Sequence, residues 1–233
     1  MSDDPTAYDL EFFWDPVCPF AWVTSRWVAL VAEQIEMTVD WRFIGLRILN
    51  EDKDYATDFP AGYPEYHSLG LRGLRVAAAV RSAEGKAPMG PLYAALGDGI
   101  WNRLPDGTGD MLAGYAEDTA TRAALAACGL SESFVEHLHD ESQDDIIRAD
   151  TEDALERTGR DVGTPIVALA NGGPAFFGPV ISRVPPADEA VELWDAVMTL
   201  ARWPGFSEMK RLADKRLDPL ALSCLPRQLD SNA

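Results

Sequence analysis

An aromatic run that gives way to a helix at a Cys-Pro pair dominates the start of the chain. Residues 9–14 have the length of a strand and end in aromatic side chains, and Pro16 then interrupts them. From 19 to 34, apolar residues recur every three or four positions, the spacing of a helix with one buried face. Residues 38–43 alternate between apolar and polar, as in a half-buried strand. These segments predict a βαβ unit with Cys18 between its first strand and its helix.

The middle of the chain carries helical signals. Residues 65–158 contain Ala- and Leu-rich segments at helical spacing, broken by proline and glycine, so we expect four or five helices there. Strand signals return at 165–169 and 175–177 on either side of a glycine turn, which predicts a hairpin. An amphipathic helix is expected after Pro186.

This order of elements is that of an α/β protein, a thioredoxin fold with an α-helical insertion domain. We assign the N-terminal half of the thioredoxin fold to residues 1–62 and the helical insertion to 63–160. The C-terminal half then spans 161–212, and 213–233 form a tail that we expect to be poorly ordered in part.

Composition and charge exclude several partners. The chain has 38 Asp and Glu residues against 20 Lys and Arg, a formal net charge of −18, so its surface field repels nucleic acid. No stretch approaches the roughly 20 apolar residues of a membrane span, and the first residues lack the features of a signal peptide. We therefore expect a soluble cytoplasmic protein that binds neither nucleic acid nor a membrane. A homodimer is compatible with the sequence.

The three cysteines, Cys18, Cys128 and Cys224, are too few and too scattered for a disulfide framework or a zinc site. Because their number is odd, at least one thiol is free within the chain. Cys18 is the candidate nucleophile, since the unpaired N–H groups and the positive end of the dipole at a helix start favour a thiolate. The alternative is a small apolar cysteine buried at a helix end without reactivity.

The residues that follow Cys18 suggest a surface for a ligand. Pro19, Phe20 and Trp22 would stiffen the approach to the sulfur and offer flat apolar area.

A second feature is Thr164-Pro165, directly before a predicted strand. Proline at such a position is expected at the first residue of a strand or after a cis bond. A cis bond would leave the N–H and C=O groups of Thr164 available to an extended ligand. An ordinary trans proline is the alternative.

Several blocks of sequence resemble one known family when taken together: 13–19, 21–22, 24–27, 48–51, 162–165 and 176–180. The combination resembles the DsbA-like thioredoxin-fold proteins, and most of all the actinobacterial mycothiol-dependent nitroreductases, up to about Arg211. The resemblance implies that Cys18 is the attacking cysteine, that Thr164-Pro165 is a cis-proline loop facing it, and that Asn50 lines the site. It also implies thiol exchange with mycothiol and thiol-dependent reduction of small electrophiles, including nitro compounds. Without the resemblance, Asn50 is read as an Asx turn.

The chain departs from that family at Ala21, where the nitroreductase has the second cysteine of a Cys-x-x-Cys pair. One cysteine cannot resolve its own mixed disulfide, so an outside thiol must release it. Cys128, at a predicted helix end, and Cys224, in the tail, lack neighbouring charges that indicate a resolving role. We therefore predict a thiol-disulfide oxidoreductase that works through Cys18 with mycothiol or another low-molecular-weight thiol, acts on a small electrophile, and needs no metal.

Two other functions fit the same residues. A thiol-dependent transferase or isomerase of the hydroxychromene carboxylate isomerase type uses the small thiol itself as nucleophile and needs no second cysteine. A non-catalytic thioredoxin-fold binding protein would result if the missing cysteine marks a loss of catalysis. Other polar residues are weaker candidates: Arg26 has surface carboxylates as its ordinary partners, and His137 and His139 point to different faces of a helix, unlike zinc ligands.

Overall fold

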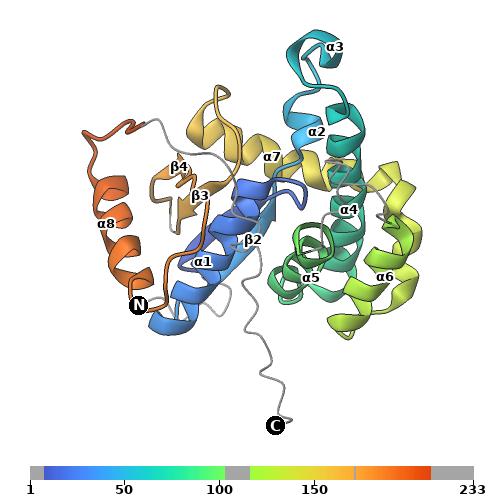
Figure 1. The fold of residues 1–233 in the computed structure, drawn as a ribbon, viewed down its shortest axis with the longest axis horizontal. Coiled ribbons are helices and arrows are strands. Elements are labelled where there is room, and N and C mark those ends of the chain that lie inside the picture. Colours follow the sequence, from blue (N-terminus) through green and yellow to red (C-terminus); the bar gives the residue numbers. More distant parts are fainter. Residues whose placement is uncertain (1–7, 103–115, 171, 211–233) are drawn as a thin grey trace.

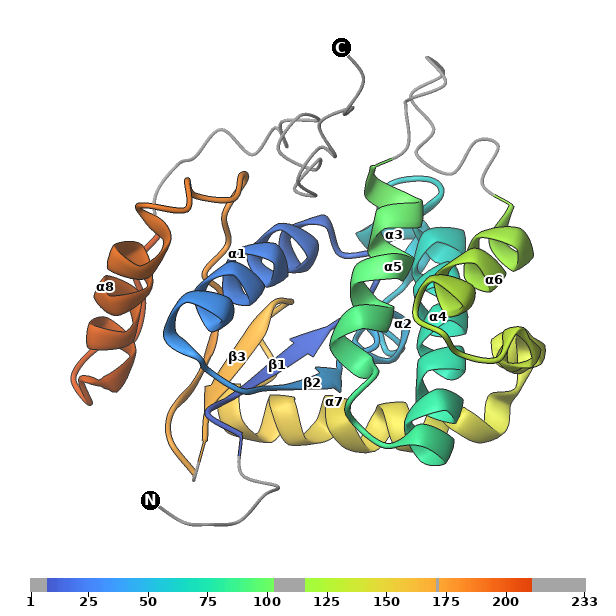
Figure 2. The ribbon, with the colours of Figure 1, turned by 90° about the horizontal axis from the view of Figure 1, so that it is seen from below.

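The computed structural model describes residues 8–102, 116–170 and 172–210. It contains a four-stranded sheet in the order β2-β1-β3-β4, whose strands are labelled across Figure 1 and Figure 2. β1 (Leu10–Trp14) runs parallel to β2 (Val39–Phe43) and antiparallel to β3 (Ile166–Leu169), which in turn pairs antiparallel with β4 (Ala175–Phe177). The predicted strands and the βαβ unit are confirmed. Asn171, in the predicted hairpin turn, lies outside the described residues.

Two helices, α1 (Pro19–Ile35) and α8 (Ala190–Arg202), lie side by side over one face of the sheet (Figure 2). The indole N–H of Trp27 in α1 donates to the carbonyl oxygen of Ala190 at 2.9 Å, and its ring meets that of Trp194 edge-on. The predicted C-terminal helix is therefore confirmed, and its apolar stripe packs on α1.

Between the two pairs of strands the described chain is mainly helical. The elements are α2 (Leu46–Leu49), α3 (Tyr55–Asp58), α4 (Tyr63–Glu84), α5 (Met89–Trp101), α6 (Glu117–Ala127), the 3-10 helices η1 (Glu132–His139) and η2 (Glu141–Gln143), and α7 (Asp144–Thr158). Within 65–158 the described residues thus form four α-helices and two 3-10 helices, in line with the predicted helical segment.

α7 covers the opposite face of the sheet from α1 (Figure 2). Ion pairs join α7 to the strands. Arg42 of β2 pairs with Asp150 of α7 at 2.9 Å, and Arg157 of α7 pairs with Glu11 of β1 at 2.6 Å. Because α7 also packs on α4, it connects the sheet to the other helices between β2 and β3. The boundaries of the insertion, 63–160, stay a prediction.

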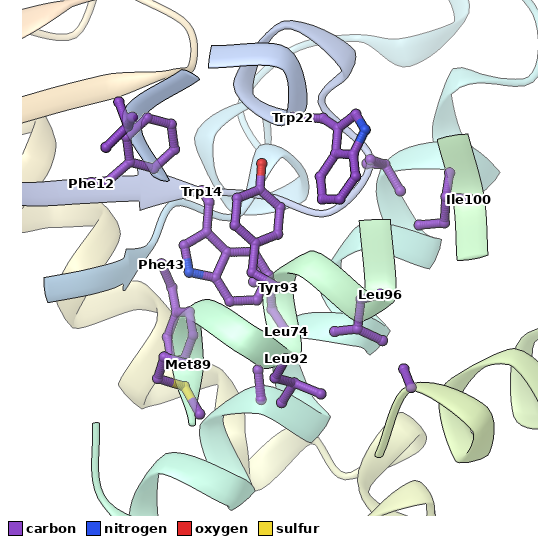
Figure 3. Packing of buried hydrophobic residues seen from close by; sticks show 14 of the residues in the cluster. Phe12, Trp14, Trp22, Phe43, Leu74, Met89, Leu92, Tyr93, Leu96 and Ile100 are labelled. Atoms are coloured by element: carbon purple, nitrogen blue, oxygen red, sulfur yellow. The ribbon is translucent and has the colours of Figure 1, made fainter. Parts of the chain in front are cut away.

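The helical segment meets the sheet through a core of large aromatic side chains (Figure 3). Trp14 of β1 stacks on Tyr93 of α5 with ring centroids 4.3 Å apart, and Trp22 of α1 meets Tyr93 edge-on. Gly97, one turn further along α5, makes room for Trp22, since a Cβ atom there would overlap the indole ring. The first turn of α1, which begins after Cys18, is thereby packed against α5.

Candidate functional site

Cys18 lies in the turn that joins β1 to α1 and is the N-cap residue of α1. Its backbone N–H donates to the carbonyl oxygen of Asp15 at 3.1 Å, which closes the turn. Its Sγ accepts a hydrogen bond from the backbone N–H of Ala21 at 3.4 Å, as a capping side chain does. Pro19 occupies the first helical turn, where a missing N–H costs nothing. The predicted placement of Cys18 at a helix start is confirmed.

Thr164 and Pro165 face Cys18 from the start of β3. The peptide bond between them is cis, as the resemblance implied. The Sγ–H of Cys18 donates to the carbonyl oxygen of Thr164 at 3.5 Å. The Thr164 hydroxyl is buried and has no hydrogen-bond partner. Two segments 146 residues apart in the sequence therefore form one site, with a thiol on one side and the proline loop on the other.

Burial dominates the chemistry of Cys18, whose exposed fraction is 6%. Burial raises the pKa of the thiol to about 12, and the negative charge of Asp15 adds to the rise, while the Ala21 N–H opposes it. This corrects the expectation that the helix start favours a thiolate. Burial favours the neutral thiol, because the loss of water around the sulfur outweighs the backbone N–H groups of Ala21 and Phe20 and the helix end.

Asp15 is a site residue that the sequence reasoning missed. Its carboxyl group is fully buried and accepts hydrogen bonds from the backbone N–H groups of Val17 at 3.0 Å and Leu46 at 2.8 Å. Gly70 of α4 packs directly on it, since a Cβ atom there would overlap Oδ1. Burial raises the pKa of Asp15 to about 7. The sequence feature that could have identified Asp15 is its place three positions before Cys18, directly after a buried strand.

The other predicted residues divide into two groups. Pro19 and Phe20 are half-buried at the start of α1, beside Cys18. Trp22 instead lies in the core at 2% exposure, with its ring against Tyr93 and the Arg26 guanidinium 4.4 Å from its centroid. The structure thus gives Trp22 a packing role and shows no open apolar face on it.

Asn50 is buried at the end of α2, and its Nδ2 donates to the carbonyl oxygen of Leu46 at 2.8 Å. Because the backbone N–H of Leu46 donates to Asp15, Asn50 is connected to the Cys18 turn through this short helix. Its side chain stabilises α2, and a role in lining the site stays a prediction.

Cys18 and Cys128 are both free thiols. Cys128 caps the end of α6, and Cys224 lies outside the described residues. Nowhere in the described ranges do three or more His, Cys, Asp or Glu side chains gather as they would to hold a metal ion. His137 pairs with Asp140, and the guanidinium of Arg26 lies over aromatic rings.

None of the helices described in the structure is both long and apolar enough to cross a membrane.

The fold and the site define a class. A thiol at the start of the first helix, facing a cis-proline loop at the start of an antiparallel strand, is the arrangement of DsbA-like thioredoxin-fold thiol oxidoreductases.

The family follows from comparison with known sequences. A family model described as mycothiol-dependent nitroreductase Rv2466c matches residues 17–211, most of the chain. This chain therefore belongs to the Rv2466c-like family, a family of thiol-dependent oxidoreductases. A Mycobacterium tuberculosis relative, described as the uncharacterized protein Rv2286c, is 29% identical over 208 residues, which cover 87% of this chain and 81% of the relative.

Solved structures agree on the fold. A probable DsbA oxidoreductase from Streptomyces coelicolor matches with a TM-score of 0.50 at 15% identity, over 88% of this chain and 94% of that one. A putative protein disulfide isomerase from Nitrosomonas europaea also has a TM-score of 0.50, at 14% identity over 82% and 97% of the two chains. A 2-hydroxychromene-2-carboxylate isomerase matches with 0.50 at 16% identity, over 83% and 96%. The thioredoxin fold with helical additions is thereby confirmed.

Proposed function

We propose that this protein is a monothiol oxidoreductase in which Cys18 forms a mixed disulfide and an external small thiol releases it. The observation that carries the proposal is the position of Cys18, the capping residue of α1 with its sulfur against the Thr164 carbonyl group. Ala21 stands where a Cys-x-x-Cys pair would have its second thiol, and its methyl group is fully buried. A resolving thiol therefore has to come from solution.

The chemistry is an exchange of sulfur partners. Cys18 attacks one sulfur of a disulfide RSSR, the new bond between Sγ and sulfur forms, and one RSH leaves. A second thiol then attacks the mixed disulfide, which restores the Cys18 thiol and gives a new disulfide. If the substrate is a nitro compound, two thiols supply two electrons, so that the products are a nitroso compound, one disulfide and water.

The small thiol is mycothiol under this proposal, since the matching family is described as mycothiol-dependent. Small electrophiles, nitro compounds among them, are the proposed substrates. A cytoplasmic location accords with the proposal, because a catalytic thiol that must return to its reduced state is expected in a reducing compartment.

Mass spectrometry of the intact protein tests the proposal. The chain is incubated with oxidised mycothiol, or with oxidised glutathione in a parallel sample, and weighed under conditions that preserve disulfides. We expect one adduct on the wild type and on Cys128→Ser, and none on Cys18→Ser. If the folded wild type acquires no adduct on Cys18, the proposal is wrong, and a non-catalytic binding protein becomes the better description.

A second function is favoured by the burial of Cys18, which raises the pKa of its thiol. In a thiol-dependent isomerase or transferase the bound small thiol is the nucleophile, so the protein sulfur needs no ionisation. Cys18→Ser would then keep most of the activity toward a substrate that is isomerised or conjugated. Loss of nearly all activity in Cys18→Ser supports the monothiol oxidoreductase instead.

A further inference from the structure

We propose that Arg47 and Lys53 bind the acidic group of a flat aromatic substrate, whose ring lies against exposed aromatic side chains between α2 and α4. The proposal deepens the proposed function: it rests on Cys18 as the reacting sulfur, and it names aromatic carboxylates as a class of electrophile brought to that sulfur. α2, α3 and the start of α4 lie together at one end of the molecule (Figure 1).

Three aromatic rings form a column at this end. Tyr55 stacks on Phe59 with ring centroids 4.7 Å apart, and Phe59 stacks on Tyr63 at 5.8 Å. The ring of His67 meets all three edge-on, and its Nδ1 lies 2.9 Å from the Tyr55 hydroxyl. His67 thus holds the column on α4, while Tyr63, at 40% exposure, presents aromatic surface to solvent.

Two cations lie over this column. The guanidinium carbon of Arg47 is 4.4 Å from the centroid of Tyr55, and the Nζ of Lys53 is 5.8 Å from that of Phe59. Within the described part of the chain, neither cation has a carboxylate oxygen within 4.0 Å. Contact with a ring face leaves their N–H groups available to an anion. Because the formal net charge of −18 repels anions in general, these two side chains mark a place where an anion is attracted.

The acidic residues nearest to the cations in the sequence have other partners or face solvent. Glu51 pairs with Arg148 of α7 at 2.6 Å. The Asp54 carboxylate caps the start of α3, and the Asp58 carboxylate accepts the backbone N–H of Asp54 at 3.1 Å. Asp52 is exposed. None of these four carboxylates lies within ion-pair distance of the two cations.

The positive charges act on the column itself. Burial first, and then the charges of Arg47 and Lys53, lower the pKa of His67 to about 4. His67 is therefore neutral at pH 7. The attraction for an anion at this end of the molecule comes from Arg47 and Lys53.

α2 connects the cations to the turn that carries Cys18. The backbone N–H of Leu46, the first residue of α2, donates to the Asp15 carboxyl group at 2.8 Å, and Arg47 is the next residue. The carbonyl oxygen of Asp15 accepts the N–H of Cys18 at 3.1 Å. Arg47 thus stands one residue from a direct hydrogen bond to the Cys18 turn.

The exposed end of the column leads to the same turn. Tyr63 contacts Tyr66 with ring centroids 6.3 Å apart, and Tyr66 meets Trp101 edge-on at 6.2 Å. The indole N–H of Trp101 donates to the carbonyl oxygen of Pro16 at 2.9 Å, two residues before Cys18. The cations on one side and the exposed ring on the other are therefore both connected to the turn of the reacting sulfur.

A flat aromatic carboxylate fits this arrangement. Its carboxylate accepts two parallel N–H bonds from Arg47, the geometry that a guanidinium favours, and Lys53 supplies a second charge. Its ring stacks on Tyr63. A neutral aromatic compound keeps the stacking and loses the charge-assisted bonds, so the site selects the acid.

Titration calorimetry on the full chain tests the proposal with a matched pair of ligands. 4-Nitrobenzoate is the acid, and 4-nitrobenzamide is its neutral counterpart of nearly the same shape. We expect the wild type to bind the acid about tenfold more tightly than the amide, and Arg47→Gln, Lys53→Gln protein to bind the two alike. Equal affinities in the wild type, no binding of the acid, or a preference that survives in the double variant would overturn the proposal.

Control variants separate the site from general effects of charge and folding. Arg122→Gln removes an exposed cation of α6 and should leave the preference for the acid in place. If the double variant does not fold, Lys53→Gln and Arg47→Lys decide. Each should narrow the preference, and a preference unchanged in both would count against the proposal.

Thiol modification shows whether the bound acid lies at Cys18. In Cys128→Ser, Cys224→Ser protein one thiol reports, and the rate at which iodoacetamide modifies it should fall as 4-nitrobenzoate saturates its site. A rate that does not depend on the ligand would mean that the acid is not a substrate of this site.

The outcomes separate this proposal from the proposed function. If mycothiol forms no adduct but the acid is preferred through Arg47 and Lys53, the oxidoreductase function fails and the binding site stands. If the adduct forms and the acid and the amide bind alike, the reverse holds.

Discussion

The sulfur of Cys18 lies 3.5 Å from the carbonyl oxygen of Thr164, a residue 146 positions later in the sequence. The sheet produces this meeting. β1 and β3 are antiparallel neighbours with Phe13 opposite Ile166, so the end of β1 and the start of β3 lie at the same edge. The turn that carries Cys18 leaves the sheet where the proline loop enters it. The position of the sulfur thus follows from strand pairing, and α4 and α5 pack on the turn that precedes it.

Introducing the missing thiol should convert the site from one cysteine to two. In Ala21→Cys we expect the mixed adduct on Cys18 to disappear, because the new thiol attacks it and forms a disulfide across the first turn of α1. Intact-mass measurement after incubation with oxidised mycothiol would show a loss of two hydrogens in place of the adduct. Since Ala21 is fully buried, the added sulfur should also lower the free energy of unfolding by about 1–3 kcal/mol.

The matched control for that variant is Ala29→Cys, which places a thiol two turns further along α1, on a partly exposed position. It should keep the adduct on Cys18. An adduct that persists in Ala21→Cys at the wild-type level would mean that the first turn of α1 does not present residue 21 to the sulfur of residue 18.

Much of the fold was predictable because local patterns and strand pairing agree. Period-two alternation in 38–43 and the helical spacing in 19–34 each identify one element, and a βαβ unit follows because a parallel pair needs a crossover between its strands. The helical segment was predictable as helices but not as a packing arrangement. Nothing in the local sequence indicates that α7 packs on the sheet, which depends on pairs such as Arg42 and Asp150 that are 108 residues apart.

The site was predictable where it depends on chain position and unpredictable where it depends on burial. The place of Cys18 at a helix start and its meeting with Thr164 followed from the sequence and the family resemblance. The raised pKa of Cys18 and the role of Trp22 in the core did not, because both arise from α4 and α5 packing over the turn. Asp15 was overlooked for the same reason, since a carboxyl group becomes notable only once it is known to be buried.

Gly97→Ala should destabilise the protein through Trp22. A methyl group at this position of α5 would overlap the indole ring, so the ring or the helix must shift, at a cost of about 1–3 kcal/mol in the free energy of unfolding. Gly99→Ala on the same helix is the matched control: its methyl group would meet only Ala120, 3.9 Å away, and should stabilise the helix by about 0.5–1 kcal/mol. Urea denaturation of both variants measures the difference, and equal stabilities would contradict the packing of Trp22 against α5.

Asp150→Ala should weaken the attachment of α7 to the sheet. The carboxyl group of Asp150 accepts hydrogen bonds from Arg42, Arg81 and the backbone N–H of Phe43, and it is largely buried. Its removal leaves two guanidinium groups short of a partner, which should cost about 3 kcal/mol of stability. Asp118→Ala breaks an exposed pair with Arg122 and should have little effect in the same urea titration. Similar losses in the two variants would show that the Asp150 cluster acts like a surface pair.

His67 should make the protein less stable in mild acid. His67 is 4% exposed, with Nδ1 2.9 Å from the Tyr55 hydroxyl, and burial together with the charges of Arg47 and Lys53 lowers its pKa to about 4. The unfolded chain therefore binds a proton at this histidine below about pH 6.5, whereas the folded chain does so only below about pH 4. Stability from this group is complete above pH 6.5 and falls as the pH drops toward 4, by an amount on the order of 2 kcal/mol.

The measurement has to separate His67 from Asp15, which acts with the opposite sign in the same range. Asp15 has a raised pKa, so the folded chain holds its proton up to about pH 7 and the unfolded chain releases it near pH 3.8. Its contribution to stability declines as the pH rises between those values. Urea titrations of the wild type and of His67→Gln at pH 7 and at a pH near 4.5 cancel the Asp15 contribution, because both proteins contain it. We expect His67→Gln to lose less stability on acidification than the wild type, and parallel losses in the two proteins would mean that His67 is already protonated in the folded chain.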